Sequence, residues 1–214
     1  MLILTLDAAG AVASVGLWDD GVLAVRHDPG GHGQAGRLPA MVAEILVTGG
    51  ISASALGAVA VTVGPGSFTG LRTAISLAHG IAMAAEIPLL PVTIADALAA
   101  VLPHLGHRAL WVALESRRGK VFLDGGDGPV ATDLASLPRP AGAVAVAGDA
   151  AVAVAARWAE AGVDVMLSDA RHPRPQDIAR AALARIPGTL PPLPLYVDPP
   201  EARAATGLRP APLA

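Results

Sequence analysis

The stretch with the most chemical content is a glycine-rich segment at residues 64–72, which reads GPGSFTGLR. It follows a continuous apolar run and precedes a helical pattern, and the free backbone N–H groups at the start of a helix can receive an anion. A P-loop needs GxxxxGK followed by Ser or Thr, and this segment has no lysine. A dinucleotide fingerprint needs GxGxxG, whereas the glycines here are spaced GxGxxxG. Neither phosphate-binding fingerprint is present.

A structural role accounts for the same segment without a ligand. A Gly-Pro-Gly turn followed by an N-cap at Ser67 or Thr69 is enough to begin a helix. We prefer this interpretation, and anion binding stays the alternative. The residues of the motif loop are Gly64, Pro65, Gly66, Ser67, Phe68, Thr69, Gly70, Leu71 and Arg72.

The sequence offers few residues for peptide hydrolysis or metal binding. The chain contains no HExxH motif, no GxSxG motif and no cysteine, so we identify no catalytic motif of a peptidase. Of the histidines, only His104 and His107 lie close together in sequence, and no carboxylate accompanies them. We therefore predict neither a metal site nor catalytic residues.

Alternating β and helical patterns must position these groups. The first half predicts an antiparallel meander of strands at residues 2–6, 12–18 and 22–26. Periodicity then predicts helices over residues 34–47, 68–85 and 94–102, and strands over residues 58–63 and 89–92. The loop at residues 64–72 thus joins a buried strand to a long helix.

The second half of the chain echoes the first. Strands are expected at residues 109–115, 120–123, 143–147 and 163–167, and helices at residues 150–161 and 176–186. We predict an α/β fold of two related lobes, an N-terminal lobe over residues 1–105 and a smaller C-terminal lobe over 106–190. Residues 191–214 form a proline-rich tail, in which only residues 195–197 look anchored.

Composition bounds the class of protein. Of the 214 residues 53% are hydrophobic and 15% charged, so the chain can bury enough apolar surface to fold. The formal net charge is -3 and no run of Lys or Arg occurs, which disfavours direct, tight RNA binding.

The apolar segments do not predict a membrane protein. The first apolar run lacks a basic flank and contains Asp7, which argues against a signal peptide. The most apolar window, residues 71–90, is interrupted by Arg72, His79, Glu86 and Pro88. We expect a cytoplasmic protein without a membrane contact.

The two long helices of the first lobe carry a candidate protein interface. Small residues along residues 68–85 permit close approach of another helix, and apolar residues of both helices form stripes. Ordinary packing within the lobe explains such stripes more often. The candidate interface residues are Leu38, Met41, Val42, Ile45, Ile75, Leu77, Ala78 and Ala82.

The motif GPGSFTGLR after a strand resembles the hallmark of the TsaB family, also called YeaZ. The resemblance extends over most of the chain. It includes the opening strand with Asp7, the segment at residues 32–46, the sequence ESRRGKVF at residues 115–122, which is similar to the family's DARRGEVY, and the ending PLYV.

The resemblance implies the two-lobe fold of actin, Hsp70 and hexokinase, a duplicated ribonuclease H-like unit. It also implies a non-catalytic part in making threonylcarbamoyladenosine in tRNA, as a partner of the paralogue TsaD. The ATPase TsaE would join through the complex, and tRNA would be contacted only indirectly. The family's contact with TsaD, and a competing homodimer contact, would lie on the helices at residues 34–47 and 68–85.

Departures from the catalytic relatives argue against catalysis by this chain. TsaD relatives hold a metal through HxxxH, and here Gly36 stands four positions after His32. Nucleotide-binding relatives place a hydroxyl after the first aspartate, and here Asp7 is followed by Ala-Ala-Gly-Ala. ATP or ADP binding is therefore not favoured, no cofactor is predicted, and Asp7 more simply caps its turn.

Two alternative functions stay open. A phosphotransferase-like enzyme would use Asp7 and Glu115 in an interlobe nucleotide cleft, with Ser67 and Thr69 as hydroxyl groups. A glycoprotease-type hydrolase is the other, since the wider family has carried that label. Fold alone licenses neither.

Overall fold

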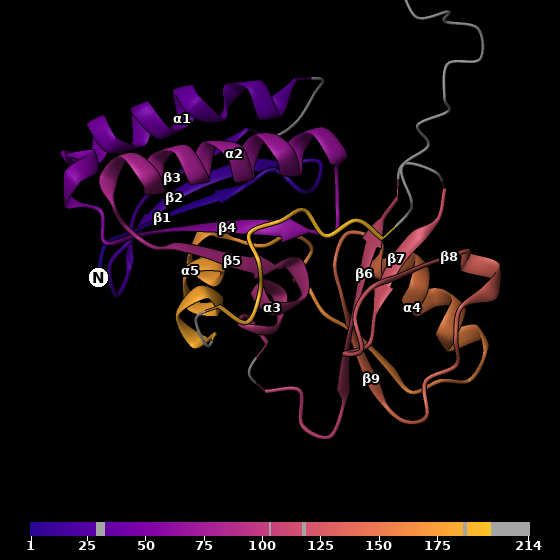
Figure 1. Ribbon diagram of the computed structural model, residues 1–214. Helices are drawn as coiled ribbons and strands as arrows, with labels where there is room; N and C mark the ends of the chain where they lie inside the picture. The colour runs from indigo at the N-terminus through magenta and orange to yellow at the C-terminus, as the bar shows by residue number, and fades with distance from the viewer. Residues whose placement is uncertain (29–32, 103, 117–118, 186–187, 198–214) are drawn as a thin grey trace, which may run out of the picture.

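Two five-stranded sheets form the framework of the chain in the computed structural model, which describes residues 1–28, 33–102, 104–116, 119–185 and 188–197 (Figure 1). The first sheet has the order β3-β2-β1-β4-β5. Its first three strands form an antiparallel meander, and β4 and β5 run parallel to β1. The strands are β1 (Ile3–Asp7), β2 (Ala13–Trp18), β3 (Val22–Asp28), β4 (Ala58–Gly64) and β5 (Leu89–Thr93).

The second sheet repeats this topology in the order β8-β7-β6-β9-β10. Again three antiparallel strands are followed by two parallel ones. The strands are β6 (Ala109–Glu115), β7 (Val121–Asp124), β8 (Val130–Thr132), β9 (Val144–Ala147) and β10 (Val165–Leu167). The recurrence confirms the predicted α/β fold, a duplicated ribonuclease H-like unit with the two-lobe architecture of actin, Hsp70 and hexokinase.

Helices cover both faces of the first sheet (Figure 1). One face carries α1 (Gln34–Gly49) and α2 (Phe68–Ala85), and the other carries α3 (Ile94–Ala99) and α5 (Pro175–Ala184). Strands β1, β2 and β4 are buried along their whole length, which explains their nearly continuous apolar sequences. Each fully buried Leu or Ile of this core contributes about 1.5–3 kcal/mol.

Helix α5 lies with the first sheet although it follows the second sheet in the chain. The division made from the sequence counted this helix with the smaller lobe, whereas it packs against β1, β2 and α3. Gly16 on β2 makes room for it, because a Cβ there would lie 2.3 Å from the Cβ of Pro175. The chain therefore crosses between the lobes twice.

The second sheet is covered by α4 (Ala151–Glu160), whose Trp158 packs edge-on against Trp111 of β6 with ring centroids 5.3 Å apart. Strand β8 was not expected, because three residues are too few to show a periodic pattern. Helix α3 also ends at Ala99, short of the expected residue 102. None of the helices in the described residues combines the length and the apolarity that crossing a membrane requires.

Candidate functional site

The GPGSFTGLR motif forms the turn between β4 and α2. Gly64 ends β4 with a φ of 113°, a conformation that a side chain would strain. Ser67 is the N-cap of α2, and its hydroxyl oxygen accepts a hydrogen bond from the N–H of Gly70 at 3.3 Å. The first turn of the helix is thus capped by its own chain.

Gly66 and Gly70 allow this turn to touch the turn between β1 and β2. A Cβ at Gly66 would lie 2.3 Å from the carbonyl oxygen of Ala9, and one at Gly70 would lie 1.9 Å from that of Ala8. The N–H of Ser67 donates to the Ala9 carbonyl oxygen at 2.6 Å. Carbonyl oxygens therefore face the start of α2, where an anion would otherwise be received.

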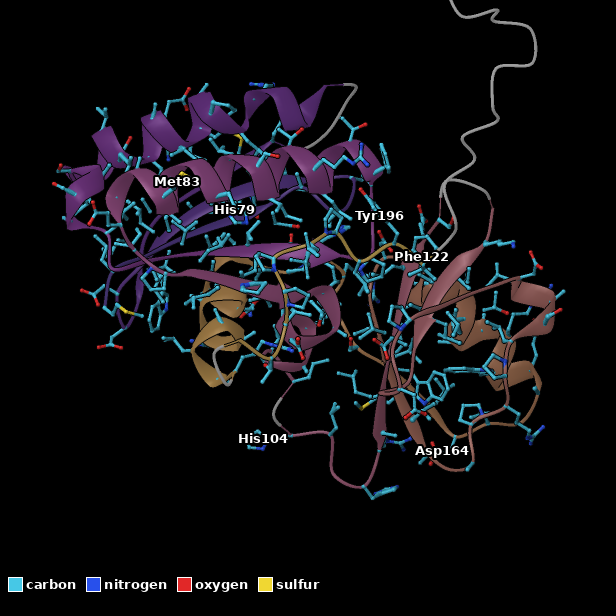
Figure 2. All side chains as sticks on the ribbon, viewed as in Figure 1. His79, Met83, His104, Phe122, Asp164 and Tyr196 are labelled. Carbon is cyan, nitrogen blue, oxygen red and sulfur yellow. The ribbon has the colours of Figure 1, made fainter. Side chains whose placement is uncertain are left out.

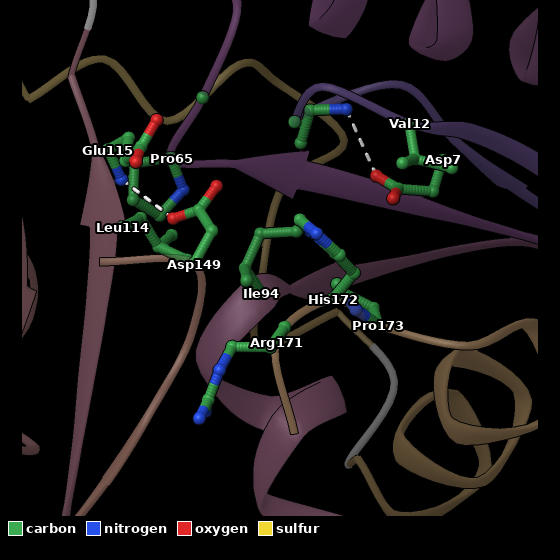
Figure 3. Close-up of a pocket in the computed structure, with 13 residues that line it drawn as sticks. Asp7, Val12, Pro65, Ile94, Leu114, Glu115, Asp149, Arg171, His172 and Pro173 are labelled. Atoms are coloured by element: carbon green, nitrogen blue, oxygen red, sulfur yellow. Dashed lines mark hydrogen bonds between the residues drawn. The ribbon is translucent and has the colours of Figure 1, made fainter. Parts of the chain in front are cut away.

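Asp7 ends β1 and is 4% exposed. Its Oδ1 accepts a hydrogen bond from the Thr62 hydroxyl at 2.5 Å. It also accepts one from the N–H of Ala9 at 3.0 Å (Figure 3). Burial raises the pKa of the Asp7 carboxyl, and the Thr62 hydrogen bond opposes this rise. The bond to the N–H two residues later makes an Asx turn, so the carboxyl shapes the β1–β2 connection.

An open recess lies between the lobes, and both Asp7 and Glu115 line it (Figure 3). The N–H of Glu115, at the end of β6, donates to Oδ1 of Asp149 at 2.7 Å. Arg171 and His172 line the recess from the connection between β10 and α5. The structure thus brings together the two carboxylates that the sequence offered for a nucleotide cleft.

Three of the polar side chains that line this recess were missed from the sequence. Asp149, Arg171 and His172 belong to no recognisable motif. Asp149 lies in the short connection between β9 and α4, whereas Arg171 and His172 lie where the chain crosses back to the first lobe. Within the described residues, no group of three or more His, Cys, Asp or Glu side chains is arranged to hold a metal ion. His32, the one remnant of the HxxxH pattern, lies outside the described residues.

The candidate interface residues are mostly core residues. Seven of them, Leu38, Met41, Val42, Ile45, Ile75, Ala78 and Ala82, are buried, and Leu77 is only partly exposed. They pack α1 and α2 onto the first sheet. The expectation that these side chains form a surface is wrong, because the apolar stripe of an amphipathic helix faces its own core.

The outer faces of α1 and α2 are formed by other residues. The two helices lie side by side on one face of the first lobe (Figure 1). Val47 on α1 is 81% exposed, and Met83 on α2 is 75% exposed. A Cβ added at Gly80 of α2 would meet nothing within 4 Å. This outer face is open to close approach by another chain.

The C-terminal segment returns to the start of α2. As predicted for residues 195–197, it is anchored: the N–H of Leu195 donates to the carbonyl oxygen of Val63 on β4 at 2.7 Å. Tyr196 then lies near the start of α2, at the opposite end of this helix from Met83 (Figure 2). The sequence indicated the anchor but not its partner strand.

Comparisons with known proteins agree on one group. The family model described as TsaD, tRNA N6-adenosine threonylcarbamoyltransferase, matches residues 32–126. The tRNA threonylcarbamoyladenosine biosynthesis protein TsaB of Escherichia coli (strain K12) is 37% identical over 125 residues, which are 57% of this chain and 53% of that protein. The protein of the same name from Haemophilus influenzae is 30% identical over 124 residues, 57% of this chain and 52% of that protein. The chain spans about half the length of these curated relatives.

Solved structures extend the likeness to nearly the whole chain at the level of fold. A Pseudomonas aeruginosa protein described as uncharacterized with similarity to peptidase YEAZ has a TM-score of 0.71 at 23% identity, covering 92% of this chain and 99% of that one. YeaZ from Pseudomonas aeruginosa has a TM-score of 0.65 at 22% identity, covering 91% and 99%. The curated matches, the family model and this common fold all make the chain similar to proteins named TsaB or YeaZ and to the TsaD family.

Proposed function

We propose that this chain is a non-catalytic partner subunit in the formation of threonylcarbamoyladenosine in tRNA, where it binds and supports TsaD. The observation that carries the proposal is the match to two curated relatives, both named tRNA threonylcarbamoyladenosine biosynthesis protein TsaB. The match to the TsaD family model agrees with a chain that is a paralogue of its partner.

The surface of the first lobe supports a role in binding. The outer faces of α1 and α2 expose the large apolar side chains of Val47 and Met83, and Gly80 leaves an open position one helical turn before Met83. Large apolar side chains that are exposed on adjoining helices are a feature of protein-binding faces. TsaD would contact this outer face, and a homodimer formed through the same helices would compete with it.

The loop geometry supports a role without chemistry of its own. In the described structure the carbonyl oxygens of Ala8 and Ala9 face the start of α2, and Ser67 caps that helix. A phosphate group at this point would have to displace the β1–β2 turn. The GPGSFTGLR motif would therefore serve to fix α2, and with it the binding face, on the lobe.

The test is reconstitution with the TsaD of the same source. The two proteins are co-purified, and threonylcarbamoyl transfer to tRNA is measured with both chains, with either alone, and with TsaE added. A complex that needs this chain for transfer, together with an inert isolated chain, is the expected result. Full transfer by TsaD and TsaE in the absence of this chain would refute the proposal.

The recess between the lobes keeps the nucleotide-binding alternative testable. Asp7, Glu115 and Asp149 line it beside Arg171 and His172, which gives it charges of both signs. Titration of ATP and ADP into the isolated chain, followed by calorimetry, separates the two functions. Saturable binding and turnover of ATP by the chain alone would favour a phosphotransferase-like enzyme over a partner subunit.

A further inference from the structure

Three exposed side chains from two distant segments meet at the start of α2. The rings of Phe68 and Tyr196 stack with centroids 5.4 Å apart and an interplanar angle of 25°. The guanidinium carbon of Arg72 lies 3.9 Å from the centroid of the Phe68 ring. Phe68 is 48% exposed and Tyr196 is 41% exposed. These three residues are called the Arg72 cluster below.

The cluster holds the guanidinium of Arg72 in one orientation. Its Nε donates to the hydroxyl oxygen of Tyr196 at 2.7 Å while its plane rests against Phe68. Tyr196 is fixed in turn, because the adjacent Leu195 is hydrogen-bonded to Val63 of the buried strand β4. An arginine that is held in place before binding loses less conformational freedom when it binds.

The charge of Arg72 is not neutralised within the described part of the chain. Among those residues no carboxylate forms an ion pair with it, and its one hydrogen bond uses Nε. Two other exposed arginines, by contrast, are paired: Arg157 with Glu160 at 3.2 Å, and Arg174 with Asp177 at 2.7 Å. The two terminal nitrogens of Arg72 thus remain as a planar fork for an oxygen pair, the geometry that a carboxylate offers.

The position of the cluster links it to the proposed binding face. Arg72, Ser76, Gly80 and Met83 are exposed and follow one another at helical spacing along α2. The cluster therefore lies at one end of the same stripe. Arginine and tyrosine are among the residues that most often carry the binding energy of protein interfaces.

We infer that the Arg72 cluster is an anchor for an Asp or Glu side chain of the partner protein, with Phe68 and Tyr196 contacting apolar atoms beside that carboxylate. The inference rests on the proposed function, since the partner is the TsaD that binds the outer face of α1 and α2. A carboxylate of a protein is favoured over the phosphates of a nucleic acid because the chain carries a formal net charge of -3.

The experiment measures the affinity of the full chain for purified TsaD at low and at high salt. We expect Arg72→Gln to weaken binding roughly ten-fold and to reduce the salt dependence of the affinity. Tyr196→Phe keeps the ring and removes the hydroxyl, so we expect a loss of roughly three-fold. Arg157→Gln, on α4 of the other lobe, removes a matched exposed charge and should bind as the wild type does. Thermal unfolding checks that each variant is folded.

A further variant, Met83→Glu, separates the two proposals, because it tests the binding face without touching the cluster. If Met83→Glu abolishes binding and Arg72→Gln binds like the wild type, the anchor is refuted and the proposed function stands. If the wild type itself does not bind TsaD, both are refuted. If Arg72→Gln binds TsaD normally but lowers the affinity of the complex for tRNA, the ligand is a phosphate and the inference is overturned.

Discussion

At the scale of single residues, two glycines of α2 lie in opposite surroundings. Gly70 lies in the first turn of α2, where a Cβ would be 1.9 Å from the carbonyl oxygen of Ala8. Gly80 lies in the middle of the same helix with nothing within 4 Å of such a Cβ. The same substitution at these two positions therefore separates helix propensity from packing.

We predict opposite effects of alanine at the two positions. Gly80→Ala should stabilise the fold by up to about 1 kcal/mol, because alanine is the better helix former. Gly70→Ala should destabilise it by about 1–3 kcal/mol, because the clash is with backbone rather than with a flexible side chain. Urea denaturation of the two variants and the wild type gives both values. Equal stabilisation by the two substitutions would show that the turns do not touch.

The buried carboxyl of Asp7 predicts a pH dependence of stability with a definite sign. Burial raises its pKa in the folded state above the ordinary value of 3.8. Between the unfolded and folded pKa values, the folded state holds more protons than the unfolded state. The free energy of unfolding therefore falls as pH rises through this window.

Asp7→Asn removes this titration while its amide oxygen can still accept from Thr62 and Ala9. We expect the stability of the variant relative to the wild type to increase as pH rises from about 3.8 and to level off above the raised pKa. Urea denaturation across this range measures the difference, and Asp127→Asn, at an exposed position, controls for the loss of one charge. A difference that is the same at every pH would contradict the prediction.

At the scale of elements, the sequence predicts the helices and strands of the first lobe well because their patterns are long. Strands such as β4 are continuous apolar runs, and α2 follows a capped turn with helical spacing. The same patterns do not show which neighbour an element will choose. Helix α5 has an ordinary amphipathic sequence. Its place on the first sheet depends on the missing side chain of Gly16 on β2, a residue that is remote from α5 in the sequence.

The candidate sites show the same limit. Asp7 and Glu115 were named from the sequence as the carboxylates of a nucleotide cleft that was not favoured, and the structure places both in one recess. Arg171 and His172 reach that recess through a connection with no regular pattern, so no local signal could mark them. The apolar stripes of α1 and α2 were real, but periodicity alone cannot tell a stripe that faces the core from one that faces a partner.

At the scale of the whole molecule, the duplicated fold leaves the two lobes with unequal surfaces. The first lobe is covered by helices on both faces, and its outer layer of α1 and α2 exposes Val47 and Met83. The second lobe has a thinner layer, in which α4 exposes Val152. Replacing an exposed apolar residue by Glu on each lobe in turn therefore tests which lobe binds the partner.

We predict that a charge on the outer face of the first lobe abolishes TsaD binding without unfolding the chain. Val47→Glu and Met83→Glu replace side chains that are mostly exposed, so Tm should change little. A charge buried in the complex should lower the affinity at least tenfold, which is about 1.4 kcal/mol or more. Val152→Glu, on the other lobe, should leave both quantities unchanged.

Ile45→Glu completes the comparison, because Ile45 belongs to α1 but its side chain is wholly buried. A charge placed there has no partner in the core, so this variant should fail at the level of folding. Circular dichroism and size-exclusion chromatography of the four variants separate loss of fold from loss of binding. Folded Val47→Glu and Met83→Glu proteins that still bind TsaD with wild-type affinity would place the interface on another surface of the chain.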